Sequence, residues 1–175
     1  MIYCKPLSPS ELLPDTFTTF HHDQRWTKQW LLCNGEWQLA DISGHRTWNA
    51  EKRIWVSDYL TQQLLCGGPV IAAFDDETLI GFASLDGKIS KEPIRYANLS
   101  MLFVDDRFQR RGIGRLLIAK IAEEARRLGA EKLFISSIPS DDTVAFYFAV
   151  GCRDAETVIP EFADAEKDRP LELQL

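Results

Sequence analysis

The sequence contains no long apolar run. No stretch approaches the ~20 consecutive apolar residues that a helix needs to cross a bilayer, and residues 1–6 lack the apolar core of a secretory signal peptide. We therefore expect a cytoplasmic protein that does not bind membranes. Internal repeats and low-complexity tracts are also missing, so the 175 residues predict a single domain over 1–175. The sequence leaves a homodimer open.

Positive charge is also scarce. Lys and Arg total 20 against 26 Asp and Glu, which gives a formal net charge of -6. Binding along a phosphate backbone requires a basic surface, so nucleic acid is not expected as a partner. A local group of arginines stands out against this acidic background: Arg107, Arg110, Arg111 and Arg115.

The chain has four cysteines and three histidines, and neither set has the spacing of metal ligands. No two cysteines form a CxxC pair, which argues against a zinc ribbon or a redox motif. They are Cys4, Cys33, Cys66 and Cys152. We therefore expect reduced, mostly buried thiols and no bound metal.

The most informative stretch runs from 99 to 129. Its apolar residues 99–104 predict a strand, 105–114 a loop, and the residues up to 128 a helix that begins at a pair of glycines. One face of this helix is apolar because Ile113, Leu116, Leu117, Ile121, Ala125 and Leu128 recur three and four residues apart. Gly129 is expected to end the helix in a left-handed conformation.

Gly112 and Gly114 stand where this helix begins. Without a Cβ they allow a ligand to approach the backbone closely. The first N–H groups of a helix have no partner within it and lie at the positive end of its dipole, so they suit a phosphate group. The neighbouring arginines carry the matching charge. The loop therefore predicts a ligand that contains phosphate, and close packing of helix on strand is the alternative explanation of the glycines.

Two common phosphate-binding motifs do not fit this loop. The dinucleotide fingerprint requires a third glycine where Leu117 stands, and the P-loop requires Lys where Arg115 stands. The segment from Gln109 to Gly114 fits Gln/Arg-x-x-Gly-x-Gly/Ala instead. After a strand that ends at Val104, it resembles the acyl-CoA-binding motif of the GNAT superfamily of N-acetyltransferases.

A second motif of that superfamily, Asn-x-x-Ala-x-x-Phe-Tyr-x-x-x-Gly-Phe, is similar to residues 140–152. Phe146, Tyr147 and Gly151 match in register. The departures are Ser140, Thr143 and Cys152, which replace the usual Asn, Ala and Phe. The two motifs stand in the expected order, and the resemblance covers residues 70–155 approximately.

The resemblance implies an α+β fold, a mixed α/β arrangement in which helices flank a central, largely antiparallel sheet. It also implies acetyl-CoA as co-substrate and direct attack of an amine on its thioester. Tyr147 is the implied catalytic residue, as a donor to the departing thiolate. The implied cofactor-binding residues are Leu102, Phe103, Val104, Gln109, Arg110, Arg111, Gly112, Ile113, Gly114, Arg115, Ser140 and Thr143.

The usual proton acceptor is not present. Many relatives carry Glu on the central strand six residues before the strand-end Val, and Asn98 stands there in this chain. A carboxylate elsewhere, such as Asp41, a chain of waters and a substrate that arrives partly deprotonated are the remaining alternatives. Asn98 favours a GNAT-fold module that binds or senses acyl-CoA without turnover. Tyr147 favours an N-acetyltransferase acting on a primary amine of a small molecule or peptide.

The residues before 70 are expected to build the acceptor site. Four of the five tryptophans lie between 26 and 48, and aromatic faces and carboxylates attract cationic amines. Trp37, Asp41 and Asn98 are the predicted acceptor-binding residues. We interpret 15–33 as one or two helices ended by Asn34-Gly35, 36–42 as a short strand or lid, 43–46 as a turn and 49–66 as a helix.

The remaining pattern predicts mainly strands. They are expected at 2–5, 70–74, 79–85, 96–104, 132–136, 153–159 and 171–175, with a loop that begins at Asp86.

Overall fold

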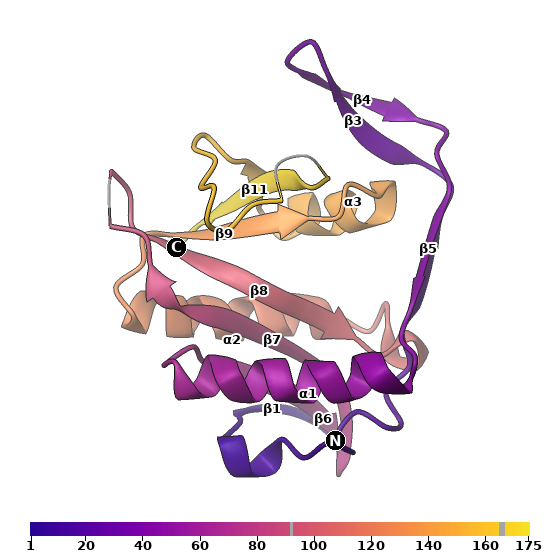
Figure 1. Cartoon of the computed structure of the whole chain (residues 1–175), viewed down its shortest axis with the longest axis vertical. Coiled ribbons are helices and arrows are strands. Elements are labelled where there is room, and N and C mark those ends of the chain that lie inside the picture. The colour runs from indigo at the N-terminus through magenta and orange to yellow at the C-terminus, as the bar shows by residue number, and fades with distance from the viewer. Residues whose placement is uncertain (92, 165–166) are drawn as a thin grey trace.

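A seven-stranded sheet forms the centre of the computed structural model, which describes residues 1–91, 93–164 and 167–175 (Figure 1). In spatial order its strands are β1 (Ile2–Pro6), β6 (Val70–Asp75), β7 (Thr78–Ile89), β8 (Tyr96–Val104), β9 (Lys132–Ser137), β11 (Arg169–Gln174) and β10 (Arg153–Asp154). β8 and β9 run parallel, and the other neighbouring pairs are antiparallel. The expected mixed α+β fold with a largely antiparallel sheet is confirmed.

Helices lie on both faces of the sheet (Figure 1). α1 (Ala50–Leu65) lies over β6 and β7 on one face, and α2 (Ile113–Arg127) lies on the opposite face. α3 (Asp141–Ala149) follows β9. Asn49 caps α1 by accepting the N–H of Lys52 at 2.8 Å.

The buried apolar side chains form two clusters, one on each face. The cluster under α1 includes Phe17, Phe20 and Trp48, and the cluster under α2 includes Leu117 and Ile121. The sheet therefore has apolar side chains on both faces, as a layer between helices requires.

The expected helices over 15–33 are wrong. That region contains β2 (Asp23–Trp26) and β3 (Gln29–Cys33), which are followed by β4 (Glu36–Ala40) and β5 (Gly44–Thr47). Asn34 and Gly35 have φ of 52° and 83°, the conformation of a two-residue hairpin turn. They join β3 to β4 and end no helix, and the turn expected at 43–46 is β5, paired with β2.

Two further expectations need correction. β7 continues through Asp86 to Ile89, where a loop was expected, because it follows β8 past two register shifts. The strand expected over 153–159 is only the two residues of β10, because the N–H of Glu156 turns toward the Glu172 side chain.

Glu172 holds the β9–β11 side of the sheet together. Its carboxylate has a side-chain exposure of 0% and accepts from Lys132 Nζ at 2.8 Å, Tyr96 Oη at 2.6 Å and Arg153 Nε at 2.9 Å. Burial alone would raise the pKa of Glu172, but these hydrogen bonds together lower it to about 2. The carboxylate is therefore charged and fully paired at neutral pH.

Candidate active site

The central feature of the candidate site is the divergence of β8 and β9. The two strands pair only from Tyr96–Lys132 to Asn98–Phe134, although β8 continues to Val104 and β9 to Ser137. Beyond Asn98 they separate (Figure 1). Buried Leu99 and the half-buried residues 100–104 therefore have no strand partner on this side, and their backbone can pair with a ligand.

A bulge marks the point where the strands separate. Ser84 lies opposite Met101 and Leu85 lies opposite Leu99, so Ser100 has no partner on β7. Bulges leave backbone groups unpaired and occur next to active sites. The Ser100 side chain contacts β7, with its Oγ 2.8 Å from Ser84 Oγ.

The glycine loop lies at the other end of this stretch, directly after β8. Within the described residues, none of the backbone N–H groups of 110–115 donates to another protein group. Arg110 and Gly112 have φ of 63° and 81°, a local geometry that turns successive N–H groups into an anion-binding concavity. A Cβ built at Gly112 would meet no atom within 4 Å, so the space over these donors is free for a phosphate group.

Gly114 has a different role. A Cβ there would lie 3.0 Å from Phe146 Cε2 and 3.8 Å from Val104 Cγ2. This glycine allows the start of α2 to pack against α3 and β8. The two explanations offered by the sequence thus divide between the two glycines, with ligand access at 112 and close packing at 114.

Arg107 does not have the role expected from its sequence position. Its guanidinium binds the fully buried carboxylate of Asp105 at 2.8 Å and donates to Thr19 O at 2.7 Å. Burial alone would raise the pKa of Asp105, but bonds from Arg107 and the N–H of His21 lower it. Arg107 therefore fixes the loop to the segment before β2. Gln109 donates to Asp106 and to the carbonyl of Val104.

The charges that remain for a ligand are Arg110 and Arg111, which are exposed and form no ion pair within the described residues. Arg111 lies 5.2 Å from the ring of Phe108. Arg115 is also exposed and donates to Ala149 O at 3.1 Å.

Tyr147 extends from α3 into the cluster on the α2 face. Its residue is 8% exposed, and burial raises the pKa of its hydroxyl well above the ordinary value. The hydroxyl has no hydrogen-bond partner among the described residues, and it is not among their fully buried unpartnered atoms. It is therefore a neutral donor with accessible surface. Burial also raises the pKa of the nearby Cys152 to about 12.

Ser140 and Thr143 are occupied by contacts within the protein. Ser140 is fully buried and donates to Thr143 Oγ1 at 2.8 Å, and Gln24 Nε2 also donates to Thr143 at 2.8 Å. The backbone of Trp30 donates to Pro139 O. These contacts join the arm formed by β2–β5 to the start of α3.

Trp37 lies on this arm, and a protein cation already covers its ring. The Arg169 guanidinium lies 4.7 Å from Trp37, 4.8 Å from Trp30 and 5.2 Å from Phe148. Asp41 is exposed between β4 and β5. The structure does not place either residue in contact with Asn98 or Tyr147.

The sequence missed a polar group around Asn98. Asn98 Nδ2 donates to Asp86 Oδ2 at 2.7 Å, and the Tyr59 hydroxyl on α1 interacts with Ser100 and Asp86. This group lies on the α1 face of the sheet. Its signal in the sequence was weak, because Asp86 was assigned to a loop.

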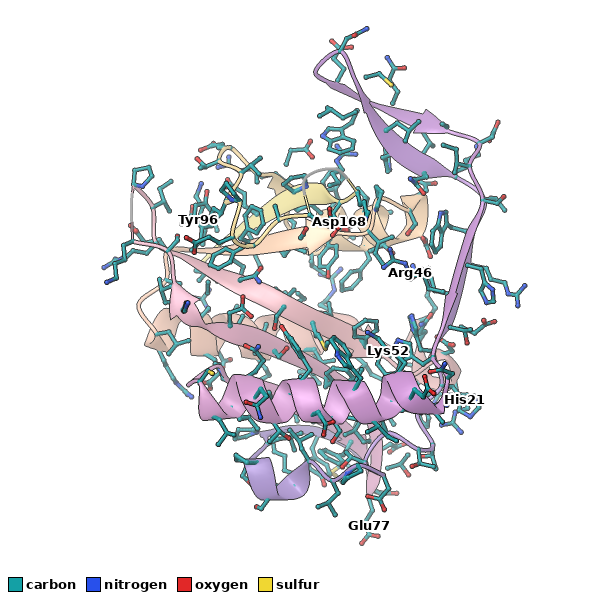
Figure 2. The ribbon with its side chains drawn as sticks, in the orientation of Figure 1. His21, Arg46, Lys52, Glu77, Tyr96 and Asp168 are labelled. Carbon is teal, nitrogen blue, oxygen red and sulfur yellow. The ribbon has the colours of Figure 1, made fainter. Side chains whose placement is uncertain are left out.

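Farther along this face, Asp168 accepts from Ser136 Oγ at 2.9 Å (Figure 2). Burial raises the pKa of this carboxyl, and the bond from Ser136 and, more weakly, the charge of Arg46 from the arm oppose the shift.

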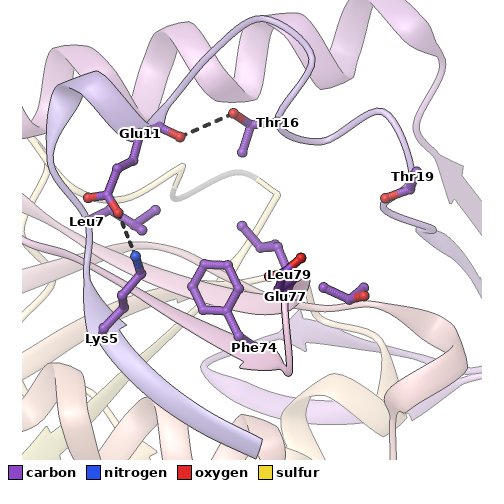
Figure 3. A pocket seen from close by; sticks show the side chains of 9 residues that line it. Lys5, Leu7, Glu11, Thr16, Thr19, Phe74, Glu77 and Leu79 are labelled. Atoms are coloured by element: carbon purple, nitrogen blue, oxygen red, sulfur yellow. Dashed lines mark hydrogen bonds and ion pairs between the residues drawn. The ribbon is translucent and has the colours of Figure 1, made fainter.

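Another hollow lies elsewhere, at the β1–β6–β7 end of the sheet (Figure 3). Its volume is about 440 Å³, and Phe74, Leu7 and Leu79 contribute its apolar lining. Two of its three charged residues, Lys5 and Glu11, pair with one another at 2.6 Å, and the third, Glu77, is exposed. Over residues 1–91, 93–164 and 167–175, no cluster of three His, Cys, Asp or Glu could hold a metal, and no helix is long and apolar enough to span a membrane.

Comparison with known proteins identifies the family. Residues 21–151 match the model described as the Acetyltransferase (GNAT) family. L-methionine sulfoximine/L-methionine sulfone acetyltransferase of Salmonella typhimurium is 30% identical over 107 residues, which are 61% of this chain and 60% of that protein. The match spans less than two thirds of this relative's length.

Solved structures share the fold at low identity. A protein described as a streptothricin acetyltransferase from Bacillus anthracis, in complex with acetyl coenzyme A, is 16% identical over 100% of both chains, with a TM-score of 0.71. PaiA N-acetyltransferase from Thermoplasma acidophilum, in complex with coenzyme A, is 16% identical over 100% of this chain and 99% of that chain, with a TM-score of 0.63.

Acetyl-CoA is the co-substrate of this fold, and the free N–H groups and open space at Gly112 fit its pyrophosphate. The family model covers most of the chain, residues 21–151. The chain belongs to the GNAT family of acetyltransferases.

Proposed function

We propose that the protein transfers the acetyl group of acetyl-CoA to a primary amine of a small molecule by direct attack in a ternary complex. The observation that carries the proposal is that the gap in pairing between β8 and β9 has different chemistry on its two faces. The donor loop and Tyr147 belong to the α2 side, and the polar group around Asn98 belongs to the α1 side. Two substrates can therefore approach one point from opposite faces.

The position of the loop sets the direction of the acyl donor. With its pyrophosphate at 109–115, the pantetheine runs back along β8 from Val104 toward Leu102, pairing with free backbone groups. Strands rise about 3.3 Å per residue, so the four residues from Val104 to Ser100 span roughly 13 Å. The thioester then lies near the bulge at Ser100, where the strands begin to diverge.

The reaction needs no covalent intermediate on the enzyme. An alkylammonium that resembles lysine has a pKa of about 10.4 and is protonated at neutral pH. It must therefore first give one proton to water, and the resulting amine attacks the thioester carbon. The C–N bond forms and the C–S bond breaks. The sulfur takes a proton from the Tyr147 hydroxyl, which recovers the proton that the attacking nitrogen gives up. The products are an acetamide, CoA thiol and one proton in solution.

The acceptor is inferred from chemistry and from relatives. One relative is named for L-methionine sulfoximine, an amino-acid derivative with a free amine, and another for streptothricin. A small-molecule amine is consistent with both. Trp37 and Asp41 belong to the arm, and we propose that they contact the part of the acceptor distant from its amine.

A thiol-release assay with acetyl-CoA and a panel of small primary amines tests the function. We expect thiol release that depends on one class of amine, and a product whose mass has increased by one acetyl group in place of one hydrogen. Tight acetyl-CoA binding without turnover on any amine would instead support a non-catalytic acyl-CoA-binding module.

A further inference from the structure

An unsatisfied acceptor lies at the point where β8 and β9 separate. Asn98 is 8% exposed, and its Oδ1 is fully buried with no hydrogen-bond partner among the described residues. The orientation of the amide follows from Asp86, because a carboxylate only accepts and the Asn98 NH₂ must therefore face it. A buried acceptor without a donor costs free energy. The unpaired Asn98 Oδ1 therefore indicates that a bound ligand donates to it.

Asp86 contributes a second acceptor at the same place. Its half-buried carboxylate uses Oδ2 for the Asn98 amide at 2.7 Å, and no Lys, Arg or His within the described residues forms an ion pair with it. Tyr59 on α1 lies close to this group: the pKa of its hydroxyl is raised mainly by burial, and Asp86 adds to the shift. The site therefore combines one unpaired negative charge with one unpaired carbonyl oxygen.

We propose that Asp86 and Asn98 form the anchor for the ammonium group of the acceptor, an inference that rests on the amine acetylation proposed above. An ammonium has three N–H donors and no acceptor, which complements two acceptors and a negative charge. Asn98 is the last β8 residue paired with β9, and Ser100 forms the bulge two residues on. The anchored nitrogen thus lies beside the place assigned to the thioester.

Asp86 also supplies a carboxylate close to position 98, where the chain has no glutamate. The β7–β8 register places Asp86 in the short stretch between the pairs Leu85–Leu99 and Ile89–Ala97. A carboxylate from β7 therefore reaches the space that a glutamate on β8 would occupy. Asn98 is a positioning residue for this carboxylate and a direct partner of the amine.

The experiment is steady-state kinetics on the full chain with the panel amine that the wild type acetylates fastest. Asp86→Asn should raise the amine KM at least tenfold, which corresponds to about 1.4 kcal/mol, and leave the acetyl-CoA KM within twofold. Asp58→Asn, on the exposed side of α1 one residue from Tyr59, removes the same charge and should leave both constants within twofold.

A second readout separates recognition from structural support. The analogue with hydroxyl in place of the amine should inhibit the wild type weakly, because it has no positive charge, and Asp86→Asn should lose most of this discrimination. Asn98→Ala should raise the amine KM less than Asp86→Asn does. If Asp86→Asn does not fold, Asp86→Glu, which keeps the charge but displaces it, should give an intermediate amine KM.

The outcomes that overturn the proposal are distinct. An unchanged amine KM in folded Asp86→Asn refutes the anchor and leaves the acetyltransferase function intact. A large rise of the amine KM in Asp168→Asn, with no rise in Asp86→Asn, has the same meaning. A wild type that acetylates no amine in the panel refutes the proposed function, and the anchor with it.

Discussion

Gly112 provides the sharpest test of the cofactor site, since ligand access and backbone strain can be separated there. Its φ of 81° lies in the left-handed region, and no atom lies within 4 Å of a Cβ built on it. A valine at this position costs about 1–3 kcal/mol of folding stability, because a branched residue is strained at positive φ. Its side chain would also fill the space above the N–H groups of 110–115.

Gly129 is a matched control on the same helix. It follows the C-terminus of α2, has a φ of 87°, and has equally open surroundings. Gly129→Val therefore introduces the same strain without approaching the cofactor. In a chain of 175 residues, each kcal/mol lost lowers Tm by about 2–4 °C, so the two variants should melt at similar temperatures.

Calorimetric titration with acetyl-CoA then separates the two effects. We expect Gly112→Val to weaken binding tenfold or more, about 1.4 kcal/mol, while Gly129→Val keeps the wild-type Kd. A wild-type Kd in folded Gly112→Val would refute the assignment of the loop to the pyrophosphate. An equal loss of affinity in both variants would show that stability, and not ligand access, controls binding.

Three further predictions follow from buried titratable groups. Tyr147→Phe keeps the ring and removes the donor, so kcat should fall by about 10²–10⁴ with little change in acetyl-CoA Kd; because burial raises the pKa of Tyr147, the phenol should cause no loss of kcat below about pH 10. Wild-type kcat with chemistry rate-limiting would contradict this role. Iodoacetamide at about pH 8 should modify exposed Cys66 and spare Cys152, whose pKa is raised to about 12, as peptide mass spectrometry can check. Glu172→Gln should cost about 3 kcal/mol at neutral pH. The Glu172 carboxyl has a pKa of about 2 in the folded protein, below its ordinary value of 4.5, so this stabilisation is complete above pH 4.5 and is lost as pH falls toward 2. A difference in unfolding free energy that does not change with pH would contradict it.

The predictions from sequence that hold depend on local pattern. The helix after Gly112 is marked by its apolar stripe and by a glycine at each end, and it is α2 within one or two residues. The strand before it is β8. These features need only neighbouring residues, so spacing is enough to predict them.

The predictions that fail depend on distant contacts. Phe17 and Phe20 lie in the buried cluster under α1, whereas Trp30 packs on Arg169 from the last strand. Their near-helical spacing is therefore coincidental. Asn34-Gly35 is compatible with a helix stop and with a hairpin turn, and only the strands on either side decide between them.

The candidate site divides in the same way. Tyr147 could be placed from its motif because the helix register fixes its neighbours, and the residues of the loop follow from the glycines. Asp86 could not, since its relation to Asn98 depends on register shifts in β7 that no spacing in the sequence reveals. The sequence alone shows that position 98 is not a glutamate, but only the structure shows that Asp86 lies beside that position.

This compensation has a physical basis in the sheet. Residues opposite one another on antiparallel strands have Cβ atoms about 4.5–5.5 Å apart, so a carboxylate on either strand can reach the same substrate atom. What the chemistry requires is a negative charge at one point in space, and the position along the chain that supplies it is free to change. A register shift makes such an exchange easier, because it brings Asp86 beside Asn98 without altering the paired residues that define the fold. A substitution at a motif position in this fold should therefore be judged together with the strand opposite it.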